Sequence, residues 1–228
     1  MKETQLLQSY PKPKYPRIVS KNLRTIEHRL IASERGQDFF DGDRNFGYGG
    51  FNYDGRWKSI AKEIIDNYGL TNGSKVLQVQ CEKGFLLKDI KALNGKINVL
   101  GTETSGYALS HVTEGIKENV LLADVRNLPF ENSLFDLVIA LGVVYTFNLT
   151  DAIRALKEIQ RVAKRKIFIT LASYEDHNDY FLFKYWTLLG TMVLKKEEWI
   201  KVLRFCNYEG DYSFTNAESL ELQQEGSF

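Results

Sequence analysis

The sequence predicts an α/β fold in which helices cover both faces of a mostly parallel, doubly wound sheet. Short β-rich apolar runs alternate with helical segments along much of the chain, and the run 135–141 is too short and too β-rich for a helix. Strands are expected at 75–80, 97–103, 119–123, 135–141 and 166–172, and helices at 57–68, 85–93, 107–117, 151–163 and 197–205.

Size and charge limit the classes of function. The 228 residues, 43% of them hydrophobic, suit one globular domain with additions. Lys and Arg number 30 against 29 Asp and Glu, so no global field favours nucleic acid or an anionic membrane. Cys81 and Cys206 lack metal-ligand spacing, and the start of the chain lacks a signal peptide. We therefore expect a reduced, cytoplasmic protein with no metal, no nucleic acid and no membrane partner.

The first 56 residues differ from the rest in composition. Pro11, Pro13 and Pro16 favour an extended lead-in over residues 1–35 rather than a helix. In 39–57 glycines alternate with aromatic and charged residues, and no helical or strand period survives. This second stretch is predicted to be an ordered loop or lid.

Periodicity supports the helices that flank the sheet. The segment 57–68 places Ile60, Ala61, Ile64 and Ile65 at helical spacing, and Gly69 follows where a C-terminal cap favours positive φ. The segment 151–163 has Thr150 available as an N-cap. Its apolar face is formed by Ile153, Leu156, Ile159 and Val162.

Repeated βα units place any ligand at the carboxyl ends of the strands, near the change in strand order. The loops after Gln80, Glu103 and Leu141 are therefore the expected site.

Four motifs resemble those of class I S-adenosylmethionine (SAM) dependent methyltransferases. VLQVQCEKGFLL is similar to the first motif, VLDVGCGxGxxL, with Gly84 as the final glycine, and GTETS resembles the second. ADVRNLPFENSLFDLVIAL resembles the third and fourth, and ALKEIQRVAKRKIFIT the next helix and strand. The resemblance covers 57–172 and implies a Rossmann-like, seven-stranded sheet. The flanks resemble a bacterial subgroup that acts on small molecules.

The resemblance implies a SAM site. Glu103 is expected to accept hydrogen bonds from both ribose hydroxyls, although a lone Glu at a strand end is often simply solvated. Asp124 is placed to meet the adenine edge, or else begins the LPF turn as a structural residue. The residues at the family's cofactor positions are Gln80, Glu82, Gly84, Glu103, Asp124, Val125 and Leu141.

The first motif departs from the family pattern. Positions usually filled by Asp, Gly and Gly are Gln78, Gln80 and Glu82. Only glycine lets a backbone approach the cofactor closely with positive φ. Gln80 adds bulk, and the Glu82 carboxylate near that of the cofactor is expected to cost roughly 1 to 4 kcal/mol at about 4 Å.

Candidate catalytic residues lie in the two loops beyond the motifs. Tyr145 follows the fourth expected strand where related enzymes often present Asn or His, and His177 follows the fifth as the natural base by its pKa. A lone loop histidine such as His177 is, however, more often simply solvated. Candidate substrate-binding residues are Arg44, Tyr48, Tyr53, Arg56, Trp57 and Tyr174, although the aromatic ones among them are as readily explained by packing of the loop onto the sheet.

Two functions remain open. The preferred one is a non-catalytic relative, a pseudoenzyme with weak or lost SAM binding that partners an active methyltransferase homologue or forms a homodimer. The alternative is an active SAM-dependent O- or N-methyltransferase of a small molecule, for example a sugar-related metabolite. The expected division is an N-terminal extension and lid at 1–56, a methyltransferase-like domain at 57–215 and a C-terminal tail at 216–228.

Overall fold

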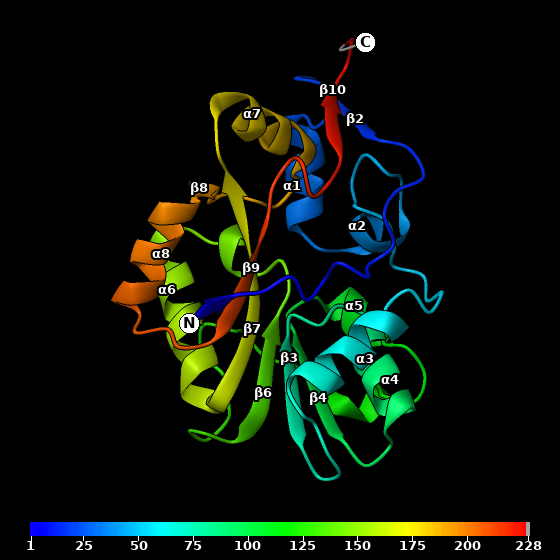
Figure 1. Ribbon diagram of the computed structural model, residues 1–228. Helices are drawn as coiled ribbons and strands as arrows, with labels where there is room; N and C mark the ends of the chain where they lie inside the picture. Colours follow the sequence, from blue (N-terminus) through cyan, green and yellow to red (C-terminus); the bar gives the residue numbers. More distant parts are fainter. Residues whose placement is uncertain (227–228) are drawn as a thin grey trace.

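A parallel sheet with helices on both faces forms the centre of the computed structural model, which describes residues 1–226 (Figure 1). The strand order is β1-β9-β7-β6-β3-β4-β5, with β8 paired to the end of β7, and every pairing is parallel. The strands are β1 (Lys2–Glu3), β3 (Lys75–Val79), β4 (Asn98–Glu103), β5 (Val120–Leu122), β6 (Phe135–Ala140), β7 (Ala163–Tyr174), β8 (Leu194–Lys195) and β9 (Asp211–Thr215).

The predicted doubly wound fold is confirmed, and the sheet has eight strands rather than seven. The two-residue β1 from the N-terminal segment pairs with β9 and extends the edge. The predicted strands and most of the predicted helices lie within a few residues of the observed ones. The order turns back at β3, whose neighbours are β4 and β6, so a ligand crevice is expected there.

Two apolar cores hold the helices against the sheet. On one face α3 (Lys58–Asn67) and α4 (Phe85–Leu93) cover Val76 and Ile139. On the other, α6 (Leu149–Val162) and α8 (Lys196–Phe205) cover Leu77 and Val138. Adjacent strand residues thus enter opposite cores, as the two-residue period of a strand requires. The two sets of helices lie on opposite sides of the sheet in Figure 1.

A third group of elements lies beyond the carboxyl ends of the central strands (Figure 1). It contains α1 (Ile26–Ser33), α2 (Gln37–Asp41) and α7 (His177–Trp186), together with β2 (Arg17–Val19) and β10 (Leu222–Gln224). β10 pairs in parallel with β2, so segments near the two ends of the chain meet here. We call the segment 26–41, which contains α1 and α2, together with α7 and the segment 187–191, the lid. The three-part division of the chain stays a prediction.

The expectation of an extended, helix-free start is wrong from residue 26 onward. The prolines end at Pro16, and Thr25 caps α1 by accepting a hydrogen bond from the N–H of His28. The stretch 39–57 also contains the end of α2, whose Phe39 and Phe40 are buried under Phe51. Burial of these aromatic residues stabilises a helical turn that the local period does not reveal.

Three helix boundaries also differ from expectation. The predicted helix 107–117 is reduced to α5 (Gly106–Ser110) and a 3-10 turn, η1 (Lys117–Asn119), with Gly115 at φ 87° between them. The cap of α6 is Asn148, not Thr150, because its side chain accepts from the N–H of Asp151. The expected loop after β7 is largely helical, since Asp176 caps α7. Within residues 1–226, no helix is both long and apolar enough to cross a membrane.

Candidate functional site

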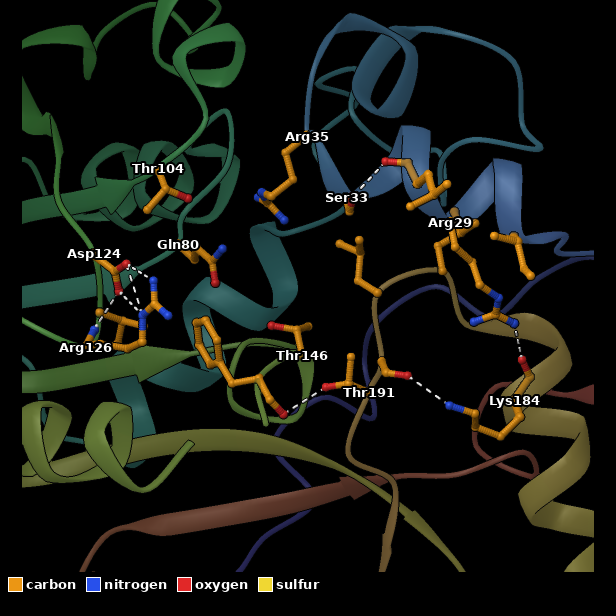
Figure 2. A pocket seen from close by; sticks show the side chains of 17 residues that line it. Arg29, Ser33, Arg35, Gln80, Thr104, Asp124, Arg126, Thr146, Lys184 and Thr191 are labelled. Atoms are coloured by element: carbon orange, nitrogen blue, oxygen red, sulfur yellow. Dashed lines mark hydrogen bonds and ion pairs between the residues drawn. The ribbon is translucent and has the colours of Figure 1, made fainter. Parts of the chain in front are cut away.

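A cavity of about 720 Å³ lies between the carboxyl edge of the sheet and the lid. It is located at the loops after β3, β4 and β6, where the strand order predicts a ligand site. Figure 2 shows its two walls. The sheet wall includes Gln80, Thr104, Asp124, Val125 and Arg126, and the lid wall includes Arg29, Leu30, Ser33, Arg35, Lys184, Leu188 and Leu189.

Glu103 ends β4 below this cavity and is fully buried. Its Oε1 accepts from the backbone N–H groups of Thr104 at 2.8 Å and Ser105 at 2.9 Å. Its Oε2 accepts from the backbone N–H of Glu82 at 2.9 Å. Three backbone donors therefore hold the carboxylate that the family resemblance assigns to the ribose.

Arg35 completes the coordination of Glu103. Its Nη2 lies 3.3 Å from Oε2 and 3.4 Å from Oε1, and its side chain is only 15% exposed. The guanidinium also packs 5.4 Å from the ring of Phe39 and 5.5 Å from that of Phe40, and the Arg35 carbonyl accepts from Ser105 Oγ at 2.6 Å. In Figure 2, Arg35 extends from the lid toward Gln80 and Thr104.

No pattern in the sequence indicates this contact. Arg35 lies 68 residues before Glu103, in a stretch where we expected an extended lead-in. Its own φ of 49° is in the left-handed region, which aims the side chain back under the lid.

The loop after β3 carries the altered first motif. Gln80 and Glu82 adopt φ of 49° and 55°, so non-glycine residues occupy the left-handed conformation that glycine favours. Gly84 has φ of 80° and begins α4, and a Cβ at this position would collide with the side chain of Ile116. The loop thus has positive φ at the positions where the family motif carries glycines, while Gln80 adds its side chain to the cavity wall.

Glu82 is a half-buried carboxyl beside a charged pair. Its pKa is raised to about 7, chiefly by burial and also by the Glu103 charge, while Arg35 and Lys83 oppose the rise. Near neutral pH this group is therefore divided between its neutral and charged forms.

The loop after β5 forms the next part of the wall. Asp124 pairs with Arg126 at 2.5 Å, and Arg126 also reaches Asp151 at 2.9 Å. The Arg126 pairing holds the pKa of the Asp124 carboxyl below its ordinary value. Val125 is buried and lines the cavity. Leu141, by contrast, packs against the core under α3 and α4 rather than lining the cavity.

The two candidate catalytic residues are not brought together at the cavity. Tyr145 lies on a 3-10 turn, η2 (Val144–Thr146), where its ring packs 6.2 Å from that of Phe183 and burial raises the pKa of its hydroxyl. His177 is exposed at the start of α7, and Tyr174 packs against Tyr180. None of these three residues lines the cavity.

The glycine-rich stretch 42–57 is held in place by its own side chains. Tyr48 accepts from the N–H groups of Leu188 and Leu189 at 2.7 and 3.0 Å, and so ties this stretch to the lid. The hydroxyl of Tyr53 donates to buried Asp89 at 2.6 Å. The remaining partners are Gly47 for Arg44, Asp54 for Arg56 and Tyr10 for Trp57. These contacts agree with the packing alternative that the sequence left open.

A second cavity of about 690 Å³ lies beside α5 and is more polar. Lys83 reaches Asp41 there at 2.5 Å, and Asp41 also accepts from Tyr107 at 2.7 Å. These groups satisfy one another and link α2 to the first-motif loop.

Residues 77–169 match the family described as a methyltransferase domain. Over 91 residues the chain is 34% identical to a mouse protein named "Probable tRNA methyltransferase 9B", covering 40% of this chain and 19% of that protein. It is 26% identical over 147 residues to an Arabidopsis thaliana tRNA (carboxymethyluridine(34)-5-O)-methyltransferase, covering 64% of this chain and 34% of that protein. The match thus spans about a fifth to a third of the length of these relatives.

Among solved structures, the fold is similar to a chain of the complex between the Haloferax volcanii Trm112 methyltransferase activator and a methyltransferase. The TM-score is 0.54 with 18% identity, over 79% of this chain and 75% of that chain. The Bacillus subtilis YcgJ protein gives a TM-score of 0.52 with 17% identity, over 64% and 66%. At such identities the likeness concerns the fold alone.

Proposed function

The chain belongs to the class I SAM-dependent methyltransferase family, and from this premise we propose that it is a non-catalytic member that partners an active methyltransferase. SAM is the cofactor of the family. We propose that the cofactor site of this chain binds SAM weakly or not at all, on the basis of one observation. The carboxylate at the ribose position is already saturated by groups of the protein itself.

The Glu103 carboxylate has little capacity left to accept hydrogen bonds from a ligand. A carboxylate offers about four lone-pair sites. Three are used by backbone N–H groups, and the Arg35 guanidinium lies across both oxygens. Ribose hydroxyls must therefore displace Arg35 to reach Glu103. A hydrogen bond to a charged group contributes about 1.5 to 3 kcal/mol, and that contribution is lost on displacement.

The first-motif loop opposes the cofactor for a second reason. Gln80 projects into the cavity, and Glu82 brings a carboxyl to the loop that in the family faces the methionine end of SAM. When Glu82 is ionised, its charge repels the carboxylate of the methyl donor. Both effects act on the same ligand, so they combine to weaken its binding.

The chemistry of the cavity also favours a non-catalytic role. Methyl transfer to an O–H or N–H group needs a base when the proton must leave. No histidine is among the cavity-lining residues of the part of the chain that the structure describes, and the carboxylate of Asp124 is paired with Arg126.

A partner of the same fold, either a homologue with a complete first motif or a second copy of this chain, accounts for retention of the scaffold. Ile26 and Leu30 on α1 are 78% and 62% exposed, and lie one helical turn apart on the same face. Such a surface suits association. The complex with an activator described above illustrates that a protein of this fold can act in a pair.

Calorimetry with SAM and S-adenosylhomocysteine tests the proposal. We expect dissociation constants weaker than about 100 µM, which corresponds to about −5.5 kcal/mol, and co-purification with a homologue whose first motif is complete. Micromolar binding of SAM by the wild-type chain would rule out the non-catalytic assignment. Failure to associate with any homologue or with itself would remove the partner role.

An active methyltransferase is the second candidate, and the cavity volume favours it. About 720 Å³ is within the range of about 300 to 1,000 Å³ typical of small-molecule sites. Under this proposal the acceptor is an O or N atom of a small molecule, or of a tRNA as the names of the relatives suggest. Transfer of a labelled methyl group from SAM in a single-turnover assay distinguishes it from the first candidate.

A further inference from the structure

The lid wall of the cavity carries two cations that have no carboxylate within ion-pair distance among residues 1–226. Arg29 projects from α1 and Lys184 from α7, and both line the cavity, where the Arg29 guanidinium lies at the backbone carbonyl of Lys184 (Figure 2). Arg29 Nη2 donates to the Lys184 carbonyl at 2.6 Å, and Arg29 Nε donates to the Arg24 carbonyl at 3.3 Å. Lys184 Nζ donates to the Gly190 carbonyl at 3.3 Å. Carbonyl dipoles accept these bonds, but they do not neutralise two positive charges.

Both side chains keep donors that no residue within 1–226 uses. Arg29 Nη1 makes no hydrogen bond in this part of the chain, and the Lys184 ammonium makes one of the three that it can donate. Burial lowers the pKa of Lys184, and the neighbouring Arg29 charge lowers it further. An anion in the cavity that accepts from both groups would use these donors and offset the repulsion.

We propose that Arg29 and Lys184 bind the phosphate of a small phosphate monoester whose apolar or aromatic part lies against Leu30, Leu188 and Leu189. A phosphate carries a charge of about −1.5 to −2 and three strong acceptor oxygens, which matches two cations with several free donors better than a singly charged carboxylate does. The leucines line the same cavity wall, and Leu30 is exposed at the end of α1.

The setting favours a small ligand over a nucleic-acid backbone. Binding along a polymer uses an extended, exposed track of cations. Here a neighbouring arginine, Arg24, is buried and donates to the carbonyls of Arg44 and Asn45. The other cations that line the cavity, Arg35 and Arg126, are paired with carboxylates. This ligand site is independent of whether SAM binds at the opposite wall.

Calorimetry at fixed ionic strength tests the site with three probes: phenyl phosphate, inorganic phosphate and acetate. We expect phenyl phosphate to bind most tightly, inorganic phosphate more weakly and acetate least. Arg29→Gln and Lys184→Gln should each weaken phenyl phosphate binding at least tenfold. The matched control is Arg165→Gln, which removes an exposed cation near the amino end of β7, away from the cavity, and should leave the affinity unchanged.

Two variants are needed because Arg29 also holds the carbonyl of Lys184, so its loss can disturb α7. Circular dichroism and the unfolding midpoint check folding, and Lys184→Gln keeps the α1 contacts intact. Unchanged phenyl phosphate affinity in both folded variants overturns the site. Equal binding of acetate overturns the phosphate assignment, and competition by an RNA oligonucleotide that depends on Arg29 and Lys184 overturns the small-ligand assignment. Titration of SAM on the same samples reports separately on the proposed function.

Discussion

The two walls of the cavity use charge in opposite ways. On the sheet wall, the Glu103 carboxylate has three backbone donors and the Arg35 guanidinium, and Asp124 has Arg126. On the lid wall, Arg29 and Lys184 have only carbonyl partners among the described residues. The charges of the sheet wall are thus paired within the protein, whereas the two cations of the lid wall have no carboxylate partner among the described residues.

This difference indicates which wall has charged groups left over for a ligand. When polar groups are already hydrogen-bonded within the protein, a ligand can only replace one partner by another, so its binding gains little free energy. Uncompensated, partly buried charge has the reverse effect, since it lowers the stability of the empty protein and is relieved by binding. Under the proposed function, the wall at the family's cofactor position has a structural role, and the lid wall has the character of a binding site.

Removal of the central carboxylate should have the largest effect. Glu103→Ala leaves three backbone N–H groups and the mostly buried Arg35 without their acceptor, and we expect the free energy of unfolding to fall by about 3 to 5 kcal/mol. Urea unfolding measures the change. Glu131→Ala, at an exposed turn, is the control and should change stability by less than about 0.5 kcal/mol. A loss below about 1 kcal/mol for Glu103→Ala would mean that the sheet wall is not held by this residue.

The second largest effect should be the contribution of Glu82 to the pH dependence of the free energy of unfolding. Its pKa is about 7 in the folded protein and 4.5 as the ordinary value, so below pH 4.5 the carboxyl is protonated in both the folded and unfolded states. As pH rises from 4.5 to 7, the unfolded chain releases the proton first, and stability falls. Glu82→Gln removes this contribution.

We expect wild-type protein to lose about 1 to 3 kcal/mol relative to Glu82→Gln across that window, because one pKa unit corresponds to about 1.4 kcal/mol and the side chain is only half-buried. Urea midpoints at several pH values measure it. Parallel curves for the two proteins would show that Glu82 titrates at its ordinary pKa.

Removal of the side chains that oppose the cofactor should have a smaller effect, which is expected on the affinity for SAM. Arg35→Ala frees the Glu103 carboxylate, and we expect SAM affinity to rise about tenfold, or about 1.4 kcal/mol. Addition of Gln80→Gly and Glu82→Gly should raise it further, because the side chains that face the ligand are removed. Calorimetry measures both steps, with Arg154→Ala, an exposed arginine on α6, as the control. No gain from any of these changes would mean that another feature excludes SAM.

The smallest expected effect is the change in stability on replacement of Lys184 in the lid wall. Lys184→Met removes a half-buried cation beside Arg29, and we expect a stability change between zero and a gain of about 1 kcal/mol at neutral pH. With saturating phenyl phosphate the wild-type protein should become more stable than Lys184→Met, because only the wild-type site gains the full binding energy. Thermal unfolding with and without the probe measures both. A clear loss of stability in the unliganded variant would indicate that Lys184 is structural.

The sequence was informative where local period and motif order decide the structure. Alternation of short apolar runs with helices sufficed for the parallel sheet, and residues such as Val76 and Leu77 entered opposite cores as their spacing requires. The motif order also placed Gln80, Asp124 and Val125 at one edge, and all three line the cavity. The ligand roles assigned to them, and to Gly84 and Leu141, stay predictions.

Only the tertiary structure decided what faces those residues. Arg35 meets Glu103 across 68 positions because α1 and α2 fold back over the carboxyl edge, and burial of Phe39 and Phe40, rather than any local period, forms that lid. Arg29 and Lys184 are 155 positions apart and belong to helices whose faces give no sign of a common ligand. Local sequence determines secondary structure through backbone and side-chain periodicity, whereas the occupancy of a site depends on long-range contacts that no local pattern encodes.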